Sequence, residues 1–141
     1  MLDATDCSFG VLAEVRHGTT GQPYLQSHAV TDIYRPGYEK TDVLSNLQFH
    51  NLQTLNGAIM TELRPVITNA PAVDPRSGGL PHGHEKLDSY CGLPVLYNGE
   101  LTGAVALGNK INGFPSGYEH ELSPVCELAA LIIADSRGLL S

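Results

Sequence analysis

Basic residues are scarce in this chain of 141 residues, which has eight Lys and Arg against fifteen Asp and Glu and a net charge of −7. Nucleic acids and anionic membranes are bound through clusters of Lys and Arg, so we expect neither as a partner. Long apolar runs are missing too, since none approaches the ~20 residues that span a bilayer. The N-terminus has neither the basic region nor the apolar core of a signal peptide.

Cysteine is also infrequent, and Cys7, Cys91 and Cys126 lack the spacing of a metal or redox motif. An odd number of cysteines without such a motif fits a reduced protein better than a disulfide framework. We therefore expect free thiols and a cytoplasmic location.

Metal and catalytic motifs are equally sparse. The best zinc set that can be drawn is His50, His82, His84 and Cys91. Closed zinc sites use paired ligands such as C-x2-C or H-x3-H, which this set does not have. A nucleophile elbow, a phosphate loop and a dinucleotide fingerprint are missing as well. We expect no metal, no cofactor and no catalysis by the domain itself.

Glycine and proline are plentiful, with fifteen and nine residues, and 42% of the residues are hydrophobic. This composition indicates a globular, sheet-rich domain with many turns. A chain of this length forms one domain with one core. We assign residues 1–141 to a single domain whose core covers about 8–137.

Alternating apolar residues predict strands over 8–16 and 24–33, joined as a hairpin by a turn with two glycines. Residues 41–47 predict a short helix, and residues 65–69 predict a short strand.

Residues 51–63 predict a longer helix, with Asn51 as the N-cap. Its apolar stripe has spacings of three and four and consists of Leu52, Leu55, Ile59 and Leu63. Gly57 lowers helix propensity, and one use for it is the close approach of another backbone.

The dipeptide Asn98-Gly99 lies between two apolar runs, which is the strongest short hairpin signal. It predicts strands over 89–97 and 100–109, and the apolar second strand places this hairpin in the middle of a sheet. Pro94 inside a strand indicates an edge position or a bulge.

Residues 118–136 predict the last helix, and Pro124 should either kink this helix or reset its start to near Ser123. Gly138 provides its C-terminal stop. Its predicted apolar face consists of Leu122, Val125, Leu128, Ala129, Ile132 and Ile133. The order of the elements predicts an α+β fold with a mainly antiparallel sheet.

Residues 74–95 read DPRSGGLPHGHEKLDSYCGLPV and combine a turn, a stiff polar loop and the entry to a buried strand. Long polar loops that lead directly into the core are disproportionately functional. The stretch resembles the signature loop of a subgroup of bacterial GAF domains, with the pattern DPR-x-GGLP-x-GHP-x-L-x-SFLG-[LI]-P. It departs from that pattern at His82, Glu85, Tyr90 and Cys91, where the subgroup usually has proline, proline, phenylalanine and leucine. It matches at Asp74, Pro75, Arg76, Gly78, Gly79, Leu80, Pro81, Gly83, His84, Leu87, Ser89, Gly92 and Pro94.

The resemblance implies a GAF-like, PAS-related fold, in which a central antiparallel sheet of five to six strands has helices on both faces. It also implies a long N-terminal helix, of which this chain would retain only the last turn. Domains of this subgroup resemble sensory modules of histidine kinases and diguanylate cyclases.

The resemblance also implies a pocket roofed by the loop over 74–89. Ligand-binding candidates are Arg76, His84, Asp74, Phe49, Asn51, Leu55, Cys91 and Leu93. Arginine presents a planar fork that suits an anionic or carbonyl-bearing ligand. The alternative is that Asp74 and Arg76 only brace the loop, and that Cys91 is a small buried apolar residue.

We therefore expect a non-catalytic sensory GAF domain that binds a small molecule and relays its presence through the terminal helix. We also expect a weak homodimer through that helix, around Leu128, Ile132 and Ile133. The alternatives are a dimerisation or spacer module with a degenerate pocket, and a small enzyme that uses Cys91 with His84 as its base.

Overall fold

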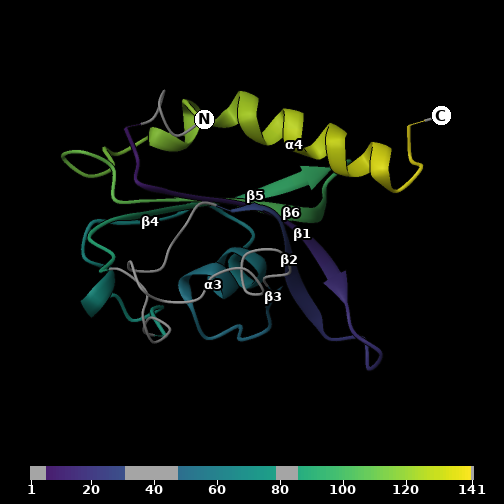
Figure 1. Ribbon diagram of the computed structural model, residues 1–141, viewed down its shortest axis with the longest axis horizontal. Coiled ribbons are helices and arrows are strands. Elements are labelled where there is room, and N and C mark those ends of the chain that lie inside the picture. Colours follow the sequence, from purple (N-terminus) through teal and green to yellow (C-terminus); the bar gives the residue numbers. More distant parts are fainter. Residues whose placement is uncertain (1–5, 31–47, 79–85, 141) are drawn as a thin grey trace, which may run out of the picture.

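The computed structural model describes residues 6–30, 48–78 and 86–140. Within these ranges six strands form one antiparallel sheet in the order β3-β2-β1-β6-β5-β4 (Figure 1). The strands are β1 Phe9–His17, β2 Pro23–Val30, β3 Gln48–Phe49, β4 Val66–Thr68, β5 Tyr90–Tyr97 and β6 Glu100–Gly108. The predicted α+β class and the antiparallel sheet are confirmed.

Both predicted hairpins are present, β1 with β2 and β5 with β6. The β5–β6 turn has positive φ at its two central residues, 51° at Asn98 and 81° at Gly99, as a type I′ turn requires. Strand β6 lies between β1 and β5, so the prediction that this hairpin is central in the sheet is also confirmed.

Pro94 lies where strand β5 is paired on one side only among the described strands. Strand β4 pairs with β5 from Tyr90 to Gly92, whereas Pro94 is opposite Ala104 of β6. A proline without a ladder hydrogen bond is tolerated at such a local edge. A register shift follows between Val95 and Leu96.

Helices α3 (Leu55–Glu62) and α4 (Ser123–Ser136) cover opposite faces of the sheet (Figure 1). Single 3₁₀ turns occur at Pro71–Val73 and Tyr118–His120. The described chain starts at Asp6 and has no helix before β1.

Helix α3 starts later than predicted, and the proposed cap was wrong. The N-cap is Thr54, whose Oγ1 accepts from the Gly57 amide over 3.0 Å, whereas Asn51 accepts from the Gln53 amide in a local turn. Gly57 has the predicted role, because a Cβ there would collide with the backbone of Leu52. Leu63 ends the helix with φ 55° and is 55% exposed, so it does not belong to the buried stripe.

Helix α4 starts at Ser123 with Pro124 in its first turn, as predicted, and Gly138 follows its end with φ 73°. Its predicted apolar face was wrong in part. Leu128 and Ile132 are 59% and 53% exposed. The residues that pack on the sheet are mostly alanines, namely Ala129, Ala130, Ile133 and Ala134. Small side chains let the helix lie close to the strands, and the bulky ones are left outside.

The core has one layer on each face of the sheet. The α3 side contains Ala13, Val15, Leu25, Leu55, Ala58, Ile59, Val66, Tyr90, Ala104 and Ala106. The α4 side contains Cys91, Leu93, Leu107, Phe114, Tyr118 and Leu122, together with Val95, Val105, Ala129, Ala130 and Ile133. Among the helices described, none is long and apolar enough to cross a bilayer.

Candidate functional site

The candidate loop begins with a bidentate ion pair. Arg76 donates from Nε and Nη2 to the two carboxylate oxygens of Asp74, each over 2.9 Å, and the Arg76 backbone N–H donates to the same carboxylate. The Asp74 side chain is only 10% exposed. The hydrogen bonds from Arg76 hold the pKa of Asp74 far below its usual range, against the opposing effect of burial. The Arg76 guanidinium is therefore already hydrogen-bonded to a carboxylate within the loop.

The loop is fitted against the N-terminus of α3. A Cβ at Gly78 would lie 2.5 Å from the Gln53 carbonyl oxygen and 2.9 Å from Cγ2 of Thr54. Only glycine allows this approach without displacing the backbone. The segment from Asp74 to Gly78 is thus held on the face of the sheet that α3 covers.

A second polar pair lies on that face. The Tyr90 hydroxyl donates to Oδ1 of Asn56 over 2.5 Å, and Tyr90 is only 6% exposed. Burial raises the pKa of Tyr90, and the charge of Arg76 acts on it in the opposite direction. The charge of Arg76 therefore acts on the Tyr90 hydroxyl, which is hydrogen-bonded to Asn56.

Sequence reasoning missed the pair of Asn56 and Tyr90 as functional candidates. The available signal was the departure of Tyr90 from the usual phenylalanine, because a buried tyrosine hydroxyl requires a hydrogen-bond partner. The partner itself, Asn56 on α3, could be found only from the fold.

Three of the predicted residues lie on the α3 side of the sheet or just before that helix. Leu55 is buried in the core layer, Phe49 is half-buried against it, and Asn51 lies exposed just before the helix. Tyr24 and His50 stack beside them, with ring centroids 4.5 Å apart. Predicted candidate His84, together with His82 and the predicted helix over 41–47, lies outside the described residues.

Two predicted residues are on the opposite face. Cys91 and Leu93 point from β5 toward α4, because side chains alternate along a strand and Tyr90 points toward α3. Cys91 is completely buried, and this burial raises the pKa of its thiol to about 12. The eight candidates therefore do not gather at one place, and Cys91 has the surroundings of a packing residue.

No cluster of three or more His, Cys, Asp or Glu suited to a metal ion occurs within residues 6–30, 48–78 and 86–140.

A sequence model of the GAF domain family matches residues 1–134. The chain belongs to the GAF domain family. GAF domains commonly act as sensory or regulatory parts of signalling proteins. No curated protein sequence matches the chain.

Solved structures agree with this assignment at the level of the fold. The GAF domain of a phosphoenolpyruvate-protein phosphotransferase from Coxiella burnetii has a TM-score of 0.76 and 16% identity, over 99% of this chain and 80% of that chain. The GAF domain of the Acinetobacter phosphoenolpyruvate-protein phosphotransferase has a TM-score of 0.74 and 16% identity, over 98% and 77% of the two chains. Type II free methionine-R-sulfoxide reductase from Thermoplasma acidophilum has a TM-score of 0.71 and 17% identity, over 95% and 84%.

Proposed function

We propose that this GAF domain is a non-catalytic sensory module of the bacterial DPR-x-GGLP-x-GH subgroup. It binds a small molecule on the α3 side of the sheet, beneath the loop that begins at Asp74, and relays the bound state to helix α4. The parent protein would then be a signalling protein such as a histidine kinase or a diguanylate cyclase.

The observation that carries the proposal is the pairing of polar groups on the α3 side. Arg76 with Asp74 and Tyr90 with Asn56 bring two hydrogen-bonded pairs to the face of the sheet whose apolar core layer includes Leu55. Small-molecule sites have this composition, with apolar walls and a few polar groups that fix orientation. Both pairs are held in place before any ligand arrives, which lowers the entropic cost of binding.

The Asp74 carboxylate narrows the class of ligand. A strongly anionic ligand would have to share Arg76 with Asp74, at a distance where like charges repel. A carbonyl oxygen needs only one N–H and brings no net charge. We therefore propose a carbonyl-bearing ligand, with a singly charged anion as the less favoured form.

Catalysis through Cys91 has little support. The thiolate is the nucleophilic form of cysteine, and burial raises the pKa of Cys91 to about 12. The side chain packs among Leu93, Leu107 and Phe114. The likeness to the sulfoxide reductase is a likeness of fold and does not transfer that activity.

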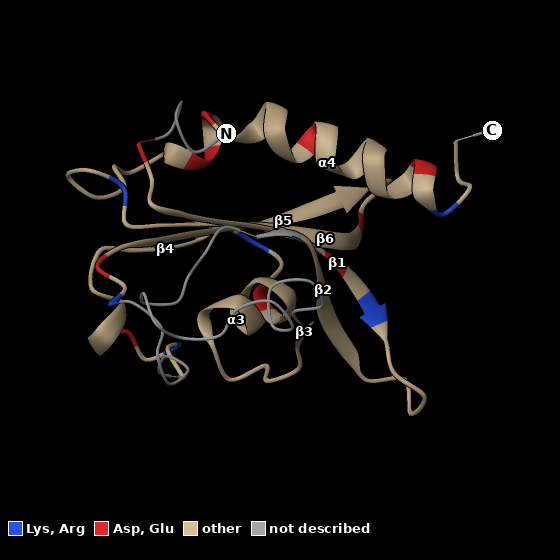
Figure 2. Ribbon diagram, in the orientation of Figure 1, with Lys and Arg blue, Asp and Glu red and all other residues tan. Residues whose placement is uncertain are grey.

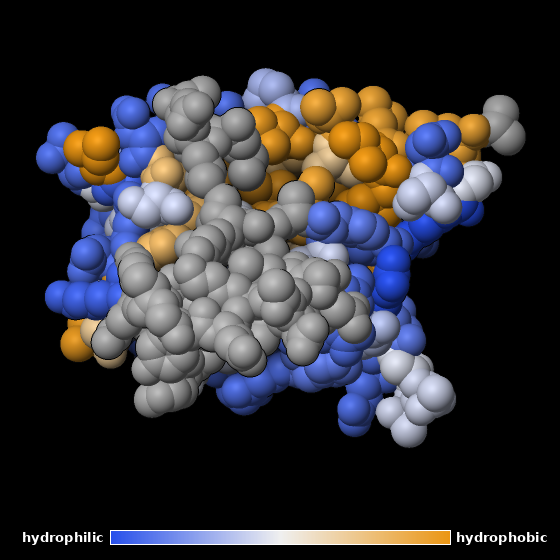
Figure 3. Space-filling model, viewed as in Figure 1, coloured by the Kyte–Doolittle hydropathy of each residue, from blue (hydrophilic) through white to orange (hydrophobic). Residues whose placement is uncertain are grey.

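The second candidate function is a dimerisation module, and the outer face of α4 favours it. Leu128, Leu131 and Ile132 are 59%, 49% and 53% exposed, and apolar side chains gather over this helix (Figure 3). Ile133, which we expected in the interface, is 2% exposed and packs on the sheet instead. We propose a weak homodimer through Leu128, Leu131 and Ile132.

Native mass spectrometry of the purified domain tests the sensory function by detecting a co-purified molecule. The identified molecule is then added back at 100 times its dissociation constant, where it should stabilise the fold by about 2.7 kcal/mol. Tyr90→Phe should weaken binding, and Glu100→Gln, which changes an exposed residue at the β5–β6 turn outside this loop, should not. If the domain is folded and dimeric but no bound metabolite stabilises it, the sensory function is wrong and the domain is a dimerisation module.

A further inference from the structure

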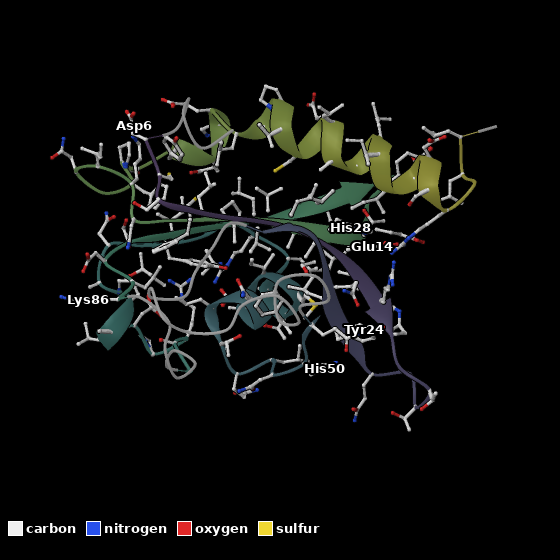
Figure 4. All side chains as sticks on the ribbon, in the orientation of Figure 1. Asp6, Glu14, Tyr24, His28, His50 and Lys86 are labelled. Carbon is white, nitrogen blue, oxygen red and sulfur yellow. The ribbon has the colours of Figure 1, made fainter. Side chains whose placement is uncertain are left out.

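A buried carboxylate joins three elements on the α4 side of the sheet. Glu14 of β1 is 5% exposed. Its Oε2 accepts from Nε of Arg137 over 2.6 Å, and its Oε1 lies 2.7 Å from Nε2 of His28 and 3.4 Å from Nη2 of Arg16. Figure 4 places Glu14 and His28 side by side beneath the C-terminal end of α4. Burial of an acid at this depth requires such partners.

Arg137 is the residue that ends α4. Its backbone N–H donates to the carbonyls of the last turn, and its Nη2 also donates to the carbonyl of Val15 over 2.5 Å. One guanidinium thus contacts both the side chain of Glu14 and the backbone of β1. Basic residues lie at the end of α4 and at the end of β1 (Figure 2).

His28 reaches Glu14 because of an irregularity in the sheet. The register of β1 with β2 changes from Leu12 opposite Ala29 to Ala13 opposite Ser27, which leaves His28 as an extra residue in β2. The bulge directs its ring toward Glu14, so the contact involves the position of β2 as well as that of β1.

Glu14 also belongs to a row of residues that are paired across neighbouring strands of the sheet. Glu14 is opposite Gln26 of β2, which is opposite Gln48 of β3, and the two amide side chains bond over 2.9 Å. On the other side Glu14 is opposite Gly103 of β6. A Cβ at Gly103 would lie 2.7 Å from Cδ1 of Ile133, so α4 rests directly on this row.

The charge balance keeps Glu14 ionised. Burial alone would raise the pKa of Glu14. The hydrogen bonds from Arg137 and His28 and the charges of Arg137 and Arg16 together lower it by more, so the pKa lies below its usual value. The carboxylate is therefore present to hold Arg137 at neutral pH.

We propose that Glu14 and Arg137 form a latch that fixes the last turn of α4 to β1, with His28 coupling the latch to β2. Release of the latch frees the end of α4 while the rest of the helix stays on the sheet. The latch deepens the relay in the proposed function, but its existence does not depend on a ligand.

Hydrogen exchange of the ligand-free domain tests the latch. Arg137→Met keeps the side-chain stem and removes the fork, and it should accelerate amide exchange over residues 133–139 by roughly tenfold or more, the effect of losing a charged hydrogen bond. Exchange in the centres of β5 and β6 should not change. Unchanged exchange at the end of α4, or equal acceleration everywhere, would overturn the latch. Glu127→Gln is the matched control, since it removes a charge from the exposed side of α4.

Two further variants separate the latch from a simple effect of charge on the helix dipole. Arg137→Lys keeps the positive charge at the helix end but has a single donor nitrogen, which cannot take the places of both Nε at Glu14 and Nη2 at Val15. The latch predicts faster exchange in this variant, whereas wild-type protection would reject it. Adding Glu14→Gln to Arg137→Met should cause little more acceleration, because each change removes the same contact. Multiplied effects would mean that the two residues act independently.

Ligand binding is measured separately from the latch, by the affinity and thermal stabilisation of the identified ligand. Loss of ligand binding with an intact latch would refute the sensory proposal alone. Intact ligand binding with no latch would refute this inference alone.

Discussion

Asp74 and Arg76 face each other as a fork and a carboxylate, with Nε–Oδ1 and Nη2–Oδ2 both at 2.9 Å. The sequence left two roles open for this arginine, contact with a ligand and bracing of the loop. The observed bonds satisfy the bracing role directly. A ligand would use Arg76 only as part of this pair, so changes at either residue should affect both the loop and binding.

Arg76→Met is expected to destabilise the domain, because it leaves the Asp74 carboxylate, 10% exposed, without its main partner. We expect a loss of about 1.5 kcal/mol, at the lower end of the range for charged hydrogen bonds because Arg76 is 30% exposed. Urea denaturation gives the value. Arg64→Met, which removes the exposed pair with Glu62, serves as the control and should have little effect. Equal effects of the two changes would show that Arg76 does not brace the loop.

Stability should fall in acid because of Asp74 and Glu14. Both folded-state pKa values are lowered, so these groups stabilise the fold above their unfolded pKa values, and this contribution is lost as the pH falls through the folded values. We expect the urea midpoint to decrease progressively below about pH 4. The double variant Glu14→Gln and Asp74→Asn should have a lower midpoint at pH 7 and a flatter acid dependence. An acid dependence as steep as that of the wild type would assign the titration to other groups.

Gly99→Val should destabilise the β5–β6 hairpin. Gly99 has φ 81° with open space around it, so the penalty is one of backbone conformation and not of a clash. A loss of more than ~1 kcal/mol is expected by thermal or urea unfolding. Asn98→Gly should be tolerated, because glycine also adopts positive φ. Unaltered stability of Gly99→Val would contradict the type I′ turn.

Cys91 should resist alkylation in the native protein. Its side chain is fully buried and its pKa is raised to about 12, which leaves almost no thiolate. Mass spectrometry after iodoacetamide treatment should find Cys91 labelled only when the domain unfolds. Labelling should therefore follow the denaturant concentration, with Cys7 and Cys126, both partly exposed, modified first. Rapid labelling of Cys91 under native conditions would reopen the cysteine-enzyme alternative.

The dimer is tested on the exposed face of α4. Leu128→Lys together with Ile132→Lys should convert a concentration-dependent dimer into a monomer, as measured by sedimentation velocity, without loss of the fold. Val73→Lys is the control, because Val73 is 81% exposed but lies away from α4. A wild-type protein that is monomeric at all concentrations would remove this interface.

Several local features followed from the sequence alone, because the residues that cause them are neighbours in the chain. Asn98-Gly99 specifies its turn through backbone φ, and Pro124 and Gly138 define the ends of α4 in the same way. The N-cap of α3 was harder to predict from the sequence, since Asn51 and Thr54 are both suitable N-cap residues. The choice fell to Thr54 because Asn51 closes a separate local turn.

Tertiary structure decided everything that depends on which side of an element meets the sheet. Helix α4 carries apolar residues around most of its circumference, so periodicity did not define one buried face, and the close approach at Gly103 selected Ile133 and the alanines over Leu128 and Ile132. The pairs Tyr90 with Asn56 and Glu14 with Arg137 join residues 34 and 123 positions apart. The sequence determined the longer strands, the turns and the family, because these rest on short-range patterns, whereas the two-residue strand β3 was not predicted. The polar contacts between elements arose only when the folded sheet brought distant side chains together.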